Sequence, residues 1–165
     1  MKPAIDFAME CPSWAGLGNL ERIVTDAIHA ALAETAAEIL AEAEVSLLFC
    51  DDAAIKTLNK AWRGENKATN VLSFASPGPL ARRMMIGDIA IAFETTEAEA
   101  LAEGKPLEAH VSHLVVHGFL HLLGYDHEHE ADAETMENME RRVLASLGIA
   151  DPFAGADLRI ATDTE

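Results

Sequence analysis

The chain has 165 residues, of which half are hydrophobic and 24% are charged, and its formal net charge at pH 7 is −16. This composition excludes fibrous and low-complexity proteins, and the length suits a single domain with a sizeable core. No run approaches the ~20 apolar residues of a membrane span, and residues 1–6 lack the apolar core of a signal peptide. We therefore expect a cytoplasmic protein that does not enter a membrane.

The basic residues are unevenly distributed. The acidic balance argues against broad nucleic-acid binding, because phosphate contacts need Lys and Arg side chains. Six of the twelve basic residues nevertheless lie between positions 56 and 83, and they are Lys56, Lys60, Arg63, Lys67, Arg82 and Arg83. A local cationic patch is therefore compatible with the sequence.

Hydrophobic periodicity and turn residues predict strands alternating with helices. We expect strands within 3–8 and at 45–50, 70–75 and 86–93, and helices at about 21–44, 53–62, 94–103, 106–123 and 131–147. This alternation predicts an α/β fold, a single domain over residues 1–150 with a small, mostly parallel mixed sheet of about four strands and five or so helices. Residues 151–165 have no strong pattern, and we expect a loosely ordered C-terminal tail there.

Three histidines have the spacing His-x3-His-x5-His. Residues four apart lie on one helical face, so His117 and His121 can converge on one ion. Gly124 then ends the helix, and the short link after it can bring His127 over the same face. Three protein ligands with a fourth position for water are typical of catalytic zinc, whereas structural sites usually have four cysteine-rich ligands. We predict that these histidines bind one Zn²⁺ per chain in a hydrolase.

Alternatives to this metal site are weaker. Two histidines four apart could be a hydrogen-bonded core pair, but the third histidine favours a metal. We expect His110, His113 and His129 not to be ligands, with His113 either touching the ligand shell or simply packing. Imidazole also suits nickel and other metals, so the spacing does not select zinc alone. The two cysteines, Cys11 and Cys50, match no disulfide framework or metal knuckle and should be small buried side chains.

A peptidase is disfavoured by one position. The zinc-protease motif His-Glu-x-x-His places its general base directly after the first ligand, where this chain has Gly118. A peptidase would need its base from Asp126 or a remote carboxylate.

The motif His-Gly-x-x-His-Leu-x-Gly-Tyr-Asp-His at 117–127 resembles the signature of the YbeY endoribonucleases, which are bacterial metal-dependent RNases. The resemblance extends to Leu-Asn-x-x-Trp-Arg-Gly at 58–64, Thr-Asn-Val-Leu-Ser-Phe at 69–74 and Gly-Asp-Ile at 87–89, and covers most of residues 45–148. It implies that the three histidines hold zinc and that Arg63 takes part in activity. It also implies cleavage of single-stranded RNA, in maturing the end of small-subunit ribosomal RNA and in quality control of defective ribosomes.

The guanidinium of Arg63 gives a permanently charged fork suited to phosphate. Further candidates lie near Arg63 in the sequence. Lys60 and Lys67 are candidate contacts for the RNA backbone, with a solvated surface as the alternative. Ser73 could orient substrate, or it could only shape its strand. Asn70 stands where the family usually has Asp, which leaves open any role for a carboxylate there.

Two classes of function follow. The leading hypothesis is a zinc-dependent, single-strand-specific endoribonuclease. The other is a non-catalytic ribosome-assembly factor with a structural zinc, docking on ribosomal RNA or a small-subunit protein. The second predicts that removing the metal unfolds the protein.

Overall fold

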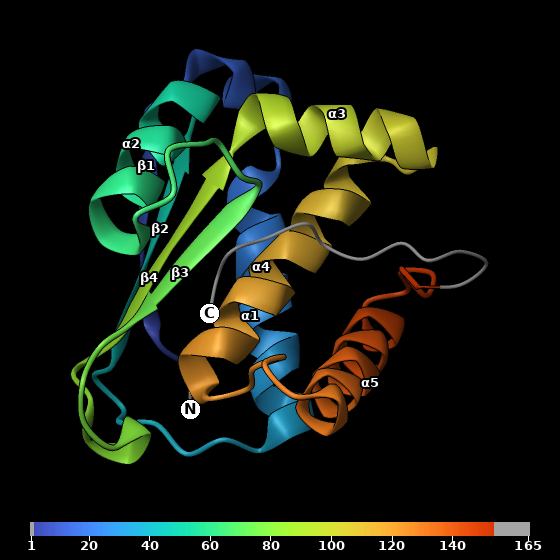
Figure 1. The fold of residues 1–165 in the computed structure, drawn as a ribbon. Helices are drawn as coiled ribbons and strands as arrows, with labels where there is room; N and C mark the ends of the chain where they lie inside the picture. Colours follow the sequence, from blue (N-terminus) through green and yellow to red (C-terminus); the bar gives the residue numbers. More distant parts are fainter. Residues whose placement is uncertain (1, 154–165) are drawn as a thin grey trace.

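The computed structural model describes residues 2–153, in which helices cover both faces of one mixed sheet (Figure 1). The strands are β1 (Ala4–Met9), β2 (Glu44–Cys50), β3 (Val71–Ala75) and β4 (Met85–Ala92), in the order β1-β2-β4-β3. Strands β1, β2 and β4 are parallel, and β3 pairs antiparallel with β4 at one edge. The predicted α/β class with a small, mostly parallel mixed sheet is confirmed, whereas most of the tail predicted at 151–165 lies outside the described residues.

The helices form layers around this sheet. They are α1 (Leu20–Thr35), α2 (Asp52–Arg63), α3 (Phe93–Glu103), α4 (Leu107–Leu123) and α5 (Glu130–Ser146), with short 3-10 helices at Pro12–Gly16 and Leu80–Arg82. Helix α2 lies on one face of the sheet, α1 and α4 lie on the other, and α5 packs outside these two (Figure 1). Within residues 2–153, no helix combines the length and the apolar character needed to cross a bilayer.

The first long helix is shorter than its sequence predicts. We expected it to continue to about residue 44, but it ends at Thr35, and Ala36 adopts a left-handed conformation with φ of 54°. Ile39 is buried after this turn, and β2 begins at Glu44. Packing of the returning chain therefore overrides the high helix propensity of residues 36–43.

Strand alternation divides the core in two. Val71 and Ile89 face α4 and α1, whereas Leu72 and Ala90 pack on the side of α2. Cys50 belongs to the α2 side, where burial, followed by nearby carboxylates, raises the pKa of its thiol to about 12. Both cysteines are buried and free, as predicted.

Helix α4 is the central helix, and it is buried almost all round. Such helices read as apolar on every side in sequence. The helix lies close to the sheet at Gly118, because a Cβ there would be 3.0 Å from Ile89 Cγ2 and 3.4 Å from Val71 Cγ2. Gly87 on β4 makes a second close approach, to Leu122 near the end of α4.

We predict that Gly87→Ala destabilises the fold. The added Cβ would lie 2.6 Å from the Phe74 carbonyl oxygen and 2.7 Å from Leu122 Cδ2, so backbone must move. The free energy of unfolding in urea should fall by about 1–3 kcal/mol. Gly16→Ala is the control, because nothing lies within 4 Å of the point that its new methyl group would occupy, and it should change stability by less than about 0.5 kcal/mol. Equal effects of the two substitutions would contradict this account.

Candidate metal centre

The end of α4 explains how the three predicted ligands meet. Gly124 closes the helix in the left-handed region with φ of 112°, and its N–H donates to the His121 carbonyl. The chain then turns back toward the last turns of α4, and α5 begins at Glu130. This reversal places His127 beside the two histidines of the helix.

The structure brings His117, His121 and His127 together. One ring nitrogen of each lies within 4.8 Å of the corresponding atoms of the other two. Ring centroids are separated by 4.8 Å for His117 and His121, 5.1 Å for His121 and His127, and 5.8 Å for His117 and His127. The donor set is therefore three imidazoles, which suits a divalent transition metal.

The protonation of these rings also fits a metal. His117 Nδ1 is 2.8 Å from Glu140 Oε2, whereas the buried Nε2 has no hydrogen-bond partner among the described residues. A ring that donates its Nδ1–H to a carboxylate keeps a lone pair on Nε2, as a ligand requires. Burial, together with the two neighbouring histidines, lowers the pKa of His121 to about 3, so this ring is neutral at physiological pH.

Glu140 is the site residue that the sequence predictions missed. It lies on α5 with a relative exposure of only 1%, and its other oxygen, Oε1, is 2.7 Å from His113 Nε2. Burial by itself disfavours the charged form, but His117 and His113 outweigh it and lower the pKa of Glu140 to about 2. Its spacing from Met136 and Val143, which are buried on the same helix, was the available signal, because it puts a carboxylate at an apolar position.

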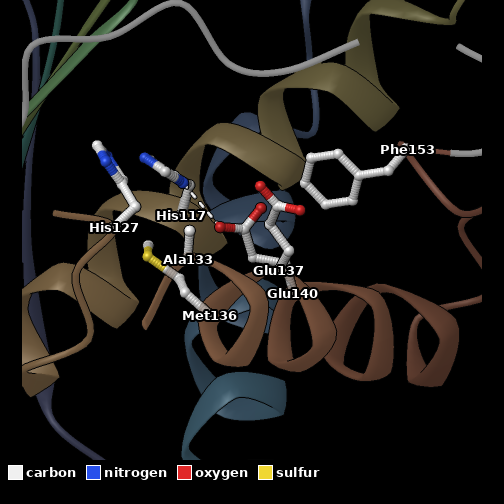
Figure 2. A pocket seen from close by; sticks show the side chains of 7 residues that line it. All are labelled: His117, His127, Ala133, Met136, Glu137, Glu140 and Phe153. Carbon is white, nitrogen blue, oxygen red and sulfur yellow. Dashed lines mark hydrogen bonds and ion pairs between the residues drawn. The ribbon is translucent and has the colours of Figure 1, made fainter. Parts of the chain in front are cut away.

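A cavity of about 130 Å³ adjoins the histidines. Figure 2 shows His117 and His127 at one end and Phe153 at the other, with Glu137 and Glu140 between them. The cavity is too small for a nucleotide, so only a metal, its water or one substrate group would fit inside.

The remaining histidines have other surroundings. His110 is buried near the start of α4, with its Nε2 2.8 Å from Glu99 Oε1 on α3. His113 lies against Glu140, and His129 is exposed at the start of α5.

Asn70 also contacts the carboxylate that pairs with His110. Its Nδ2 donates to Glu99 Oε1 at 3.0 Å. An aspartate at this position would put two carboxylates in contact, so the amide is the better partner for Glu99 here.

Arg63 is held at the edge strand. We had expected Arg63 to be the first residue of the loop after α2. It is instead the last residue of that helix, because the helix ends on Gly64 in the left-handed region. Arg63 Nη2 donates to the Ser73 carbonyl at 2.6 Å, and its guanidinium lies 5.0 Å from the centre of the Phe74 ring. These contacts hold the positively charged Arg63 guanidinium against β3.

The other residues predicted to contact the substrate differ in their exposure to solvent. Lys60 and Lys67 are exposed, and Lys67 Nζ lies 4.0 Å from Glu65. Ser73 is only 4% exposed, and its hydroxyl has no hydrogen-bond partner among the described residues. Ser73 therefore belongs to the interior of the α4 face, whereas the two lysines belong to the surface.

The structure gives a reason for Gly118. This position faces Ile89 and Val71 on the sheet, on a different side of α4 from the histidines, so a glutamate there would displace these side chains and would not point at the ligand cluster. Asp126 accepts a hydrogen bond from the Glu128 N–H and lines a surface depression with Asp132, not the cavity beside the histidines. Neither position supplies the general base of a peptidase.

The chain is similar to known proteins over most of its length. The family model described as endoribonuclease YbeY matches residues 15–148. A protein named endoribonuclease YbeY from Methylocella silvestris is 53% identical over 153 residues, which cover 93% of this chain and 87% of that protein. One of the same name from Beijerinckia indica is 57% identical over 162 residues, covering 94% and 79%.

A solved structure supports the fold. The solution structure of TM1509 from Thermotoga maritima has a TM-score of 0.55 and covers 87% of this chain and 91% of that chain, at 23% identity. That similarity concerns the fold alone, whereas the family model and the two relatives cover most of the sequence. The chain belongs to the endoribonuclease YbeY family, and thus to the hydrolytic nucleases.

Proposed function

We propose that this protein is a zinc-dependent endoribonuclease that cleaves single-stranded RNA. The observation that carries the proposal is the cluster of three imidazoles within 4.8 Å, one of which has its Nε2 buried and unpartnered among the described residues. Three neutral nitrogen ligands and no thiolate match a catalytic zinc site, which keeps one position for water. When bound, zinc would lower the pKa of that water and polarise a phosphate oxygen.

The protein's own residues would divide the remaining work. His117, His121 and His127 hold the ion, and Arg63 binds the phosphate through a guanidinium fixed by the Ser73 carbonyl. A fixed cation stabilises charge that develops on phosphate without reorganising during the reaction. Lys60 and Lys67 are weaker candidates for contacts to the RNA backbone, and Ser73 supports the arginine more directly than it meets the substrate.

We further propose ribosomal RNA as the target, in maturation of the small-subunit RNA end and in ribosome quality control, within the cytoplasm. Family membership supports this target. Contacts with the ribosome or a small-subunit protein are part of the same proposal. An acidic protein that needs a highly charged substrate would gain specificity from such additional contacts.

His121→Ala should abolish both metal binding and RNA cleavage. Two imidazoles remain, and the loss of one of three ligands leaves too few to retain zinc during purification. Metal content by mass spectrometry and cleavage of single-stranded and duplex ribosomal RNA test this. His129→Ala is the control, because that histidine is exposed, and it should keep about one zinc and full activity. Full cleavage by metal-free His121→Ala would refute a metal-dependent mechanism.

Arg63→Ala should reduce cleavage by on the order of 100-fold while zinc remains bound, because a fixed positive charge is lost from the phosphate site. Arg63→Lys should recover only part of the rate, since an ammonium cannot form the same fork. Single-turnover cleavage rates and metal content measure this. Arg82→Ala, at an exposed position in the same basic segment, is the matched control. A wild-type rate in Arg63→Ala would remove Arg63 from the mechanism.

Chelation should inactivate the protein without unfolding it. Helix α4 is held by core residues such as Leu114, Val115 and Phe119, which are fully buried independently of the histidines. Circular dichroism of the chelated protein should therefore stay native at room temperature, and zinc should restore cleavage. Unfolding upon chelation would instead favour the assembly factor with a structural zinc.

A further inference from the structure

We propose that Glu140 and His113 form a positioning pair for His117, and that this pair sets the orientation, tautomer and metal affinity of that ligand. The pair would act through His117 and would not touch the substrate. The proposal rests on the metal site proposed above, and deepens it by assigning a role to two residues outside the ligand set.

The carboxylate of Glu140 bridges two successive turns of α4. Its Oε2 lies 2.8 Å from His117 Nδ1, and its Oε1 lies 2.7 Å from His113 Nε2 (Figure 2 shows the His117 contact). An ionised carboxylate only accepts hydrogen bonds, so both ring nitrogens must carry the hydrogen. The hydrogen on His117 is thereby confined to Nδ1, and Nε2 is left to bind the metal ion.

His113 holds the second oxygen of the carboxylate. Without it, Glu140 could rotate about its last bond and still reach His117 in several ways. With both oxygens engaged, the plane of the carboxylate is fixed between the two rings, and so is the plane of His117. A carboxylate behind a ligating histidine also makes the ring a stronger donor.

Both members of the pair are buried. His113 is 4% exposed and Glu140 1%. The Phe153 ring meets His113 edge to face, with centroids 5.5 Å apart, and the Arg141 guanidinium lies 4.9 Å from the centre of the Phe153 ring. A buried hydrogen bond to a charged group is stronger than an exposed one, which suits a pair whose purpose is to hold one ring still.

A simpler explanation is that Glu140 only joins α4 to α5. That explanation accounts for the burial but not for the choice of partners, because one of the two rings is itself in the ligand cluster and has its other nitrogen buried without a hydrogen-bond partner among the described residues. The two explanations differ in what they predict for metal affinity of the folded protein.

The test is metal affinity in Glu140→Gln. The amide keeps the shape of the side chain, but one of its ends is an NH₂ donor, so His117 or His113 must give up its present tautomer. Titration of the metal-free protein with Zn²⁺ against a competing chelator should show affinity lowered by about 10- to 100-fold. The visible spectrum of the Co²⁺-loaded protein should change as well, because the His117 ring moves.

Three further single variants and the double variant of His113→Leu with Glu140→Gln complete the experiment. Glu134→Gln is the matched control on the exposed side of α5 and should bind Zn²⁺ like the wild type. His113→Leu should lower affinity in the same direction but less, and its effect should not add to that of Glu140→Gln, because both act on one contact. Glu140→Asp keeps the charge but shortens the reach, and should fall between wild type and Glu140→Gln.

The outcomes are distinguishable. Lower metal affinity in variants that remain folded by circular dichroism supports the pair. If Glu140→Gln does not fold, Glu140→Asp and His113→Leu decide the question by the same titration. Unchanged affinity and an unchanged Co²⁺ spectrum, with only the unfolding temperature lowered, would leave Glu140 as a helix-joining residue and overturn the proposal. A wild-type protein that binds no metal would instead refute the proposed metal site itself.

Discussion

The close contact between α4 and the sheet is the constraint on which the site depends. Gly118 allows this contact, because no Cβ comes between the helix and Ile89. One side of the helix is thereby committed to the sheet, and the side about 100° away, which carries His110, His113 and His117, is directed toward α3 and α5. Gly118 and the ligand His117 are adjacent in sequence, and they therefore lie on two different faces of the same helical turn.

Burying several histidines on one helix carries an electrostatic requirement. Each imidazole has at least one N–H that must find an acceptor once water is excluded. Glu99 provides this acceptor for His110, and Glu140 provides it for both His113 and His117. Glu99 therefore serves the fold, since an unsatisfied ring would destabilise α4. Glu140 serves the fold and the site together, since a wrongly protonated His117 could not bind a metal.

The sequence was informative where the chemistry is local. The spacing of His117 and His121 specifies a helical face, and Gly124 specifies where the helix stops, so both could be predicted without a structure. Glu140 was missed because α5 carries several acidic residues. Its position in line with the apolar Met136 and Val143 was the one local signal, and the role of the carboxylate follows only from the packing of α5 against α4. The early end of α1 at Thr35 was also missed, because tertiary packing of Ile39 outweighs local propensity.

The acidic balance of the whole chain is a poor guide to the field near the site. Within the basic segment at 56–83, two arginines donate hydrogen bonds to backbone carbonyls, one on β3 and one at the end of α4. Arg63 donates to Ser73 on β3, and Arg83 Nη1 donates to the carbonyl of Leu122, the residue next to His121. The carbonyls at the C-terminal end of a helix carry partial negative charge, so α4 itself helps to hold Arg83 there. A polyanionic substrate would thus meet fixed positive charge on the edge strand and at the end of α4, although it is repelled at long range by the protein as a whole.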